Sequence, residues 1–325
     1  MDDLAEKLQG VAERWFPGFT RMGEVRRLTA GATQEIWRFE IVCGEVATPL
    51  ILRRAPGGER VSASAVGLET EALLLGLAGA AGAPAPGVRH VLRPEDGLGH
   101  GFIMEFIEGE TLGGRVVRSP ELADVRPRLA RQCGEILARI HSIDPAAVPM
   151  LKRSSPTEQV NQWRASYQAT NWPRPVFELA FRWLDDHCPP DPAEPKLVHG
   201  DFRNGNLIFG PDGVRAVLDW ELAHVGDPMT DLGWICTCPW RFGGDKPVGG
   251  FGEREDLFAG YEAAGGGRVD RAHVRFWEVF GSLKWGVMCA GMTAAFRGAD
   301  PSVERAVIAR RASENEVDLM RLLAS

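Results

Sequence analysis

Residues 199–221 read His199-Gly-Asp-Phe-Arg-Asn-Gly-Asn-Leu-Ile-Phe-Gly-Pro-Asp-Gly-Val-Arg-Ala-Val-Leu-Asp-Trp-Glu221, and the architecture that we expect follows from this segment. Two apolar, β-favouring runs flank the turn residues Gly-Pro-Asp-Gly at 210–213. This pattern predicts a β-hairpin. Folding back at the turn should bring Asn206 and Asp219 near each other at the open end of the hairpin.

Asp201 lies on the loop between this hairpin and a short buried segment at 196–199, so it should lie at the same edge as Asn206 and Asp219. Phosphoryl transfer needs a carboxylate that accepts a hydroxyl proton, and it needs hard oxygen ligands that hold Mg²⁺ against the phosphates. A lone loop carboxylate is usually a solvated residue. Three polar side chains at this spacing around one hairpin instead favour a phosphoryl-transfer site.

The same segment resembles the catalytic loop and metal-binding strand of the aminoglycoside phosphotransferase and choline kinase family, which are small-molecule relatives of the protein kinases. The resemblance implies that Asp201 is the catalytic base and that Asn206 and Asp219 bind Mg²⁺. It also implies that Arg203 stabilises charge on the transferred phosphoryl group, because many protein kinases carry a lysine two positions after the base.

The run at 223–234, AHVGDPMTDLGW, is similar to one branch of this family, whose kinase domains are fused or adjacent to acyl-CoA dehydrogenases. In this branch Asp231 is expected to bond the backbone of the catalytic loop. Asp219 is followed by Trp-Glu rather than Phe-Gly, and eleven residues separate it from Asp231. This interval is too short for an activation loop, so a small-molecule acceptor is favoured over a peptide.

The segments at 37–41 and 50–53 have the pattern of two strands. The segment at 28–34 precedes both as a candidate turn over the phosphates, with Gly31 as its glycine. Arg53 ends the second strand, where this family usually has a lysine and the branch has Leu-Arg-Arg. By this resemblance Arg53 contacts the nucleotide phosphates, and an arginine can do so in a bidentate manner.

The partner of Arg53 is expected on the next helix, which supplies Glu69 and Glu71 as candidates. We expect Glu71, because it aligns with the Arg-Glu-Tyr pattern of the family. Two further strands, at 88–92 and 102–107, flank another hairpin turn. The second of them resembles the hinge between kinase lobes, where backbone groups from Glu105 to Ile107 would bond an adenine.

Downstream of this hinge the sequence becomes helical. Apolar residues recur at helix spacing from 129 to 140 and end at His141, which we expect to be a capping or packed residue rather than a catalytic one. Helices are also expected at 271–290 and 301–323. Four aromatic residues of the segment 150–196 either line the acceptor pocket or belong to the core: Trp163, Tyr167, Trp172 and Trp183.

Composition sets limits on the partners. The chain has 325 residues, 44% of them hydrophobic, and a formal net charge of −7, so it can bury a sizeable core and has no basic stripe for nucleic acid. Its six cysteines are scattered, which is typical of reduced thiols. The acidic start has no apolar signal core, and no run is long enough to span a membrane. We therefore expect a cytoplasmic protein that binds no nucleic acid and no membrane.

Taken together, the resemblance implies an α+β, two-lobed protein-kinase-like fold with a small antiparallel β lobe and a larger, mainly helical lobe. The expected nucleotide-binding lobe is 1–104, and the expected catalytic and acceptor-binding lobe is 105–325. The implied activity is transfer of the γ-phosphoryl group of ATP, or of GTP, with Mg²⁺, to a hydroxyl of a small molecule. The acceptor class is either aminoglycoside-like or a hydroxylated metabolite.

Two other functions are compatible with the same sequence. A nucleotide-binding regulator without turnover would keep the fold, and Arg53 in place of lysine leaves room for it. A metallohydrolase would use four residues, namely His199, Asp201, Asp219 and His224. Attack by water, however, needs a more complete set of nitrogen and oxygen ligands than these residues provide.

Overall fold

The computed structural model describes residues 2–28, 34–56, 66–296 and 303–324. The chain divides into two compact units. The first comprises Met1–Gly109 together with Arg215–Leu222, and the second comprises Glu110–Val214 together with Ala223–Ser325. The expected phosphate-covering glycine, Gly31, lies outside the described residues.

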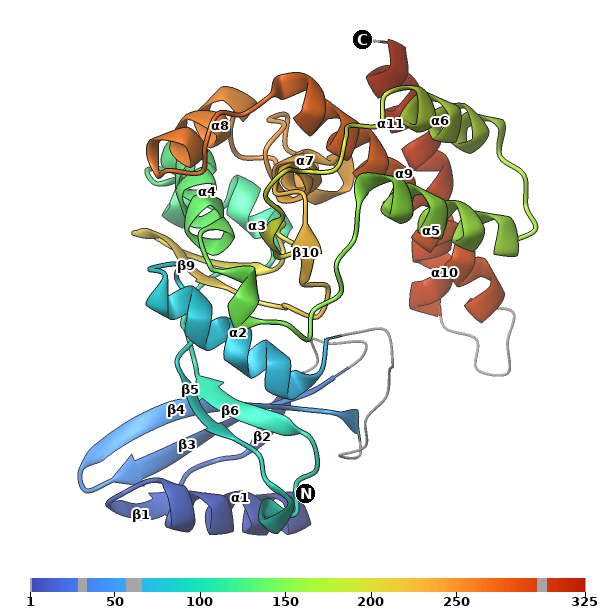
Figure 1. Cartoon of the computed structure of the whole chain (residues 1–325). Helices are drawn as coiled ribbons and strands as arrows, with labels where there is room; N and C mark the ends of the chain where they lie inside the picture. The colour runs from blue at the N-terminus through green and yellow to red at the C-terminus, as the bar shows by residue number, and fades with distance from the viewer. Residues whose placement is uncertain (1, 29–33, 57–65, 297–302, 325) are drawn as a thin grey trace. The chain divides into compact units, whose positions relative to one another are not determined.

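The first unit is built on one antiparallel sheet of six strands in the order β1-β3-β4-β6-β5, with β2 paired to β3 (Figure 1). Its helices and strands are α1 (Asp2–Trp15), β1 (Phe19–Met22), β2 (Arg26–Leu28), β3 (Glu35–Cys43), β4 (Val46–Arg54), α2 (Leu68–Ala80), β5 (Val88–Val91), the 3₁₀ turn η2 (Pro94–Asp96) and β6 (Gly101–Glu105).

Helices α1 and α2 cover opposite faces of this sheet (Figure 1). Side chains alternate between the faces along a strand, so Leu50 and Leu52 of β4 join the cluster under α1. Full burial of such a side chain contributes about 1.5–3 kcal/mol. Arg53 has the opposite parity and belongs to the other face, where α2 carries Glu71. Strand β4 is central, because it pairs with both β3 and β6.

The second unit is mainly helical (Figure 1). Its elements are α3 (Gly113–Arg118), η3 (Pro120–Leu122), α4 (Arg126–His141), η4 (Pro145–Ala147), α5 (Pro156–Ala169), α6 (Pro175–Asp186), β7 (Lys196–Val198), β8 (Leu207–Gly210), β10 (His224–Gly226), α7 (Met229–Cys236), η5 (Cys238–Arg241), α8 (Arg254–Ala263), α9 (Arg271–Phe296), α10 (Val303–Ala309) and α11 (Ala312–Ala324). Strand β9 (Gly213–Val217) begins in this unit and continues into the segment Arg215–Leu222.

The predicted hairpin is present as β8 and β9. Strand β7, which leads into the predicted catalytic loop, pairs antiparallel with β10, and Val198 lies opposite His224. The helix expected at 301–323 is interrupted, since Arg311 N donates to Ile308 O and closes a turn between α10 and α11.

In the described part of the chain, none of the helices combines the length and the apolar character that crossing a bilayer requires.

An antiparallel sheet unit and a mainly helical unit are the two parts that the sequence predicted. The sequence did not indicate that Arg215–Leu222, which contains Asp219, returns to the first unit. This segment joins the first unit through backbone bonds: Val217 N donates to Pro84 O at 2.9 Å, and Val66 N donates to Glu221 O at 3.0 Å.

Candidate active site

The predicted catalytic loop is anchored by Asp231, a buried residue of α7. Its carboxylate accepts hydrogen bonds from His199 N at 2.8 Å and Gly200 N at 2.9 Å. Gly200 has φ +80°, a left-handed conformation that favours glycine. The predicted bond between Asp231 and the backbone of the loop is therefore confirmed.

His141 supports the same carboxylate from the end of α4. Its Nε2 lies 3.1 Å from Asp231 Oδ2, and its Nδ1 lies 2.9 Å from the hydroxyl of Tyr261. Burial acts to raise the pKa of Asp231, but hydrogen bonding and Coulomb attraction from His141 outweigh it and lower the pKa. The expectation that His141 is a packed residue is confirmed.

Asp201 sits on the anchored loop, where three side chains donate to its carboxylate. Trp234 Nε1 donates to Oδ1 at 2.7 Å, and Asn206 Nδ2 donates to Oδ2 at 2.6 Å. Arg203 Nε lies 3.1 Å from Oδ1 and 3.3 Å from Oδ2. The three donors orient both oxygens of the Asp201 carboxylate, and Arg203 Nε shares its hydrogen between them. The predicted proximity of Asp201 and Asn206 is thus present.

One tryptophan ring contacts Arg203 and belongs to a cluster of three indoles. The guanidinium carbon of Arg203 lies 4.4 Å from the ring centroid of Trp240, which is 5.2 Å from that of Trp234 and 4.9 Å from that of Trp285. Lys284 of α9 also contacts this cluster, with its Nζ 4.3 Å from the Trp234 centroid. The sequence predicted that the loop segment containing Trp240 borders the acceptor, but it did not single out Lys284 or Trp285, because α9 is apolar along most of its length.

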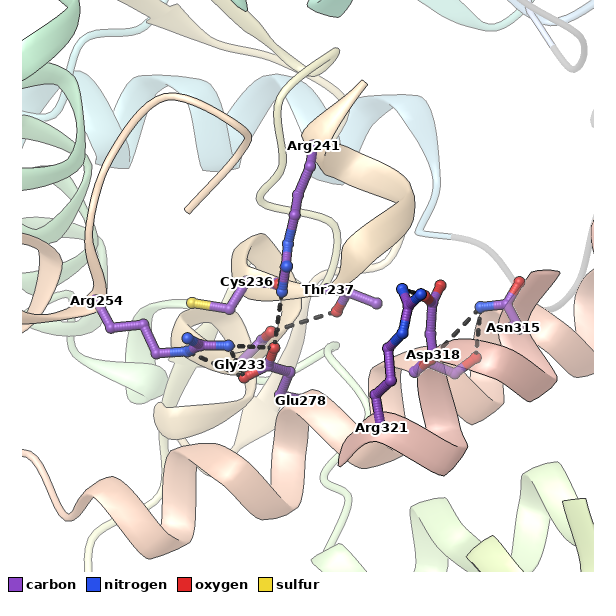
Figure 2. Close-up of polar contacts among 10 residues, drawn as sticks. Gly233, Cys236, Thr237, Arg241, Arg254, Glu278, Asn315, Asp318 and Arg321 are labelled. Atoms are coloured by element: carbon purple, nitrogen blue, oxygen red, sulfur yellow. Dashed lines mark hydrogen bonds and ion pairs between the residues drawn. The ribbon is translucent and has the colours of Figure 1, made fainter. Parts of the chain in front are cut away.

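A buried carboxylate holds the turn that carries Trp240 in place (Figure 2). Glu278 of α9 accepts from Arg241 Nη2 at 3.1 Å and from Arg254 Nη2 at 2.6 Å. Arg241 Nη2 also donates to Cys236 O, at the end of α7, at 2.9 Å. Glu278 therefore links η5 and α8 to α9, and Arg241 links η5 to the end of α7.

Close helix packing sets the position of Trp234. A Cβ atom at Gly233 would lie 2.5 Å from Trp277 Cβ, so only glycine permits this approach of α7 to α9. This approach brings the Trp234 ring over Lys284. Trp234 lies in the run that resembles the acyl-CoA dehydrogenase-associated branch, but nothing in the sequence indicated that its indole would donate to Asp201.

In the first unit, Arg53 lies between two carboxylates. Its Nη2 is 2.7 Å from Asp219 Oδ1, and its Nε is 3.2 Å from Glu71 Oε2. The predicted pairing of Arg53 with Glu71, rather than Glu69, is therefore present, and Glu69 lies 2.6 Å from His100 instead. Burial acts to lower the pKa of Arg53, but attraction to both carboxylates raises it. Burial raises the pKa of Glu71 to about 7, although Arg53 opposes this change.

Asp219 has φ +68°, which is uncommon for a residue with a side chain and is typical of strained functional positions. Carboxylate and amide oxygens are ligands that Mg²⁺ accepts, so the chemistry of Asp219 and Asn206 fits this ion. Both Nδ2 hydrogens of Asn206 go to Asp201, which leaves its Oδ1 for a ligand. That Asp219 meets Asn206 at a metal stays a prediction.

At the predicted hinge, Glu105 is the last residue of β6, and its N donates to Gly87 O at 2.9 Å. Ile107 follows in a segment without regular structure. Contacts of this backbone with an adenine stay a prediction. Within the described ranges no group of three or more histidine, cysteine, aspartate and glutamate residues could hold a metal ion, so the metallohydrolase alternative gains no support there.

The four aromatic residues whose role the sequence left open divide between core and surface. Tyr167 is buried, Trp172 is exposed, and Trp183 stacks on His187. Trp163 is half-buried and contacts Lys284, whose Nζ lies 5.8 Å from its centroid. All six cysteines are unpaired, as expected for reduced thiols.

Known proteins resemble this chain over much of its length. The model of the phosphotransferase enzyme family APH matches residues 24–277. Acyl-CoA dehydrogenase family member 10 of Mus musculus is 33% identical over 199 residues, which is 58% of this chain and 18% of that protein. A probable acyl-CoA dehydrogenase of Arabidopsis thaliana is 31% identical over 242 residues, 68% of this chain and 28% of that protein. The chain thus spans less than a third of the length of these relatives.

Solved structures share the whole fold at low identity. A putative aminoglycoside phosphotransferase from Ralstonia eutropha has a TM-score of 0.76 and 22% identity, covering 98% of this chain and 97% of that one. A choline/ethanolamine kinase family protein from Mesorhizobium loti has a TM-score of 0.65 and 17% identity, covering 100% and 95%. An aminoglycoside phosphotransferase in complex with AMP-PNP and hygromycin B has a TM-score of 0.65 and 16% identity, covering 98% of each chain.

These structures confirm the predicted α+β, kinase-like fold, and at such identities they show the fold alone. The match of the family model covers most of the chain, including Arg53, Asp201 and Asp219. The predicted resemblance is thereby confirmed, and the chain belongs to the phosphotransferase enzyme family.

Proposed function

We propose that this chain transfers the γ-phosphoryl group of ATP to a hydroxyl group of a small molecule. The observation that carries the proposal is the setting of Asp201. Its carboxylate is oriented by Trp234, Asn206 and Arg203, on a loop whose backbone is bonded to the buried Asp231. A carboxylate that is held in place and still able to accept a proton suits a general base.

In the proposed reaction the hydroxyl proton of the acceptor passes to Asp201. The acceptor oxygen forms a bond to the γ-phosphorus as the bond between this phosphorus and the bridging oxygen breaks, and ADP leaves. Arg203, whose Nε already bonds Asp201, supplies positive charge near the transferred group. Such positioning and charge stabilisation account for most of phosphoryl-transfer catalysis.

We assign nucleotide binding to the first unit. Arg53 would contact the phosphates, Glu71 would hold Arg53, and the backbone from Glu105 to Ile107 would bond the base. A structural neighbour bound to AMP-PNP supports a nucleotide of this kind, and GTP is an alternative donor. Mg²⁺, which would neutralise the phosphate oxygens when bound, is assigned to Asn206 and Asp219. The cytoplasmic location, and the absence of nucleic-acid and membrane partners, stay predictions.

The test uses the full chain and measures ADP formation from ATP and Mg²⁺ against a panel of hydroxyl compounds. The panel contains hygromycin B, choline, sugars, hydroxy acids and hydroxyacyl compounds. We expect ADP formation that depends on the acceptor. In Asp201→Ala the rate should fall by about 10²–10⁴-fold, since a positioned base contributes about this factor. The affinity for nucleotide should persist in this variant.

Asp191→Ala is the matched control, because Asp191 is an exposed aspartate of a loop. It should keep the wild-type rate. If Asp201→Ala turns over at the wild-type rate, the assignment of the base is wrong. If the chain binds ATP but forms no ADP with any acceptor, the non-catalytic nucleotide-binding regulator replaces the kinase as its function.

A further inference from the structure

A lysine of the helical unit contacts the indole that donates to the proposed base. Lys284 is half-buried on α9, and its Nζ is 4.3 Å from the ring centroid of Trp234, whose indole donates to Asp201. The cation and the proposed base therefore both contact the indole of Trp234. Among the described residues Lys284 makes no ion pair within 4.0 Å, so no neighbouring carboxylate neutralises it directly.

Two further rings of the tryptophan cluster that Lys284 contacts through Trp234 carry hydrogen-bond donors without an acceptor. Trp240 is 4% exposed, and both its Nε1 and that of Trp285 are buried without a hydrogen-bond partner among the described residues. The two rings lie 4.9 Å apart. An unsatisfied buried donor costs about 1–3 kcal/mol, so two of them on neighbouring rings of this cluster indicate a missing acceptor atom.

The charges that act on Lys284 agree with this interpretation. Burial lowers the pKa of Lys284, attraction to Asp201 and Asp231 opposes this change, and repulsion from Arg203 adds to it. A partly desolvated cation with a second cation nearby is stabilised by an anion. A polycation would instead meet repulsion from both Lys284 and Arg203.

We propose that Lys284, together with the indole N–H groups of Trp240 and Trp285, forms the acceptor subsite, and that the acceptor carries an anionic oxygen group near the hydroxyl that is phosphorylated. This inference rests on the proposed function and names the acceptor class for it. Lysine and indole supply donors only, so they match a carboxylate or a phosphate. The tryptophan faces would pack against the carbon skeleton of the same molecule.

The test compares acceptors that differ mainly in charge, with the full chain, ATP and Mg²⁺. Glycerate and glycerol 3-phosphate are the anionic acceptors, glycerol is the neutral one, and choline and hygromycin B are the cationic ones. Longer hydroxy acids extend the anionic series. We expect the highest kcat/KM for an anionic acceptor. The better of the carboxylate and phosphate series identifies which anion the subsite takes.

Lys284→Met should raise KM for the preferred anionic acceptor at least tenfold, with a smaller change in kcat and no change in KM for ATP. Lys284→Arg should restore part of this loss, because it keeps the charge. The matched control is Lys152→Met, since Lys152 is exposed and bonds only Gln162 among the contacts described for it. This variant should behave like the wild type.

Calorimetric binding of the same acceptors to the full chain separates the two proposals. Lys284-dependent binding of an anion without ADP formation would retain the subsite and reject the kinase activity. Turnover that prefers choline, hygromycin B or glycerol would overturn the subsite and retain the kinase. An unchanged KM and an unchanged affinity for the anion in Lys284→Met would overturn it as well.

Discussion

Arg53 Nη2 lies 2.7 Å from Asp219 Oδ1, so the carboxylate that we assign to Mg²⁺ is already paired with a cation inside the first unit. The same arginine also faces Glu71. Two carboxylates thus share one guanidinium. A metal ion that binds Asp219 must compete with Arg53, whereas nucleotide phosphates would offer Arg53 new partners.

Replacing Asp219 with asparagine should weaken Mg²⁺-dependent nucleotide binding on the order of 10–100-fold, because mutation of a residue in the outer shell of a metal site already lowers metal affinity by about this factor. Binding of nucleotide without metal should change little. Calorimetry with and without Mg²⁺ measures both quantities. Asp212→Asn, in the turn of the β8–β9 hairpin, is the control. Equal losses with and without metal would argue against a metal ligand at Asp219.

Glu71 should make the stability of the chain depend on pH. Burial raises its folded-state pKa from 4.5 to about 7, so the folded state holds this proton more tightly than the unfolded state. This group therefore lowers the free energy of unfolding as the pH rises from about 4.5 to about 7. At about 1.4 kcal/mol per pKa unit, the decrease reaches at most about 3 kcal/mol.

Glu71→Gln removes this titration. The difference in free energy of unfolding, variant minus wild type, should therefore be more positive at pH 8 than at pH 5. Urea denaturation at the two pH values measures it, and contributions from titratable groups that do not interact with Glu71 cancel in the difference. Parallel curves for the two proteins would show that Glu71 does not titrate in this range.

Trp234→Phe removes the indole N–H that donates to the proposed base, Asp201, and keeps most of the aromatic ring. Trp234 is a positioning residue, so kcat should fall roughly tenfold, because a hydrogen bond to a charged group contributes about 1.5–3 kcal/mol. KM for ATP should stay unchanged. Trp277→Phe is the matched control, because it also removes an indole that donates to a buried carboxylate. In the wild type Trp277 Nε1 donates to Asp227 at 2.8 Å.

In urea denaturation both variants should show a similar decrease in the free energy of unfolding, whereas kcat should fall only in Trp234→Phe. An equal fall of kcat in the two variants would mean that the effect comes from general loosening of the helical unit and not from the bond to Asp201.

Gly233→Ala should push α7 away from α9, because the new Cβ would lie 2.5 Å from Trp277 Cβ and 2.8 Å from Glu278 N. Such overpacking typically costs about 1–3 kcal/mol. The rate should fall too, since α7 carries Trp234. Gly76→Ala in the exposed part of α2 has nothing within 4 Å and should instead stabilise by about 0.5–1 kcal/mol. Thermal unfolding and a rate measurement test both variants.

Local chemistry alone determined the hairpin and the pairing at its base. Apolar runs around a Gly-Pro-Asp-Gly turn form β8 and β9, and a loop of a few residues brings Asn206 to Asp201 at 2.6 Å. The strand pattern around Arg53 and the helix that carries Glu71 also follow from short-range periodicity. Their ion pair at 3.2 Å matches the resemblance to the family.

Long-range packing decided the rest. Helix α9 is apolar on most of its surface, so its sequence cannot show which of its residues lies against Trp234. The close approach of α7 to α9 at Gly233 and the ion pairs of Glu278 select Lys284 for that place. Likewise, backbone bonds to Pro84 and Val66, and not any local signal, assign Arg215–Leu222 to the first unit. Periodicity reports only local burial, whereas the neighbours of a buried side chain depend on how distant elements pack.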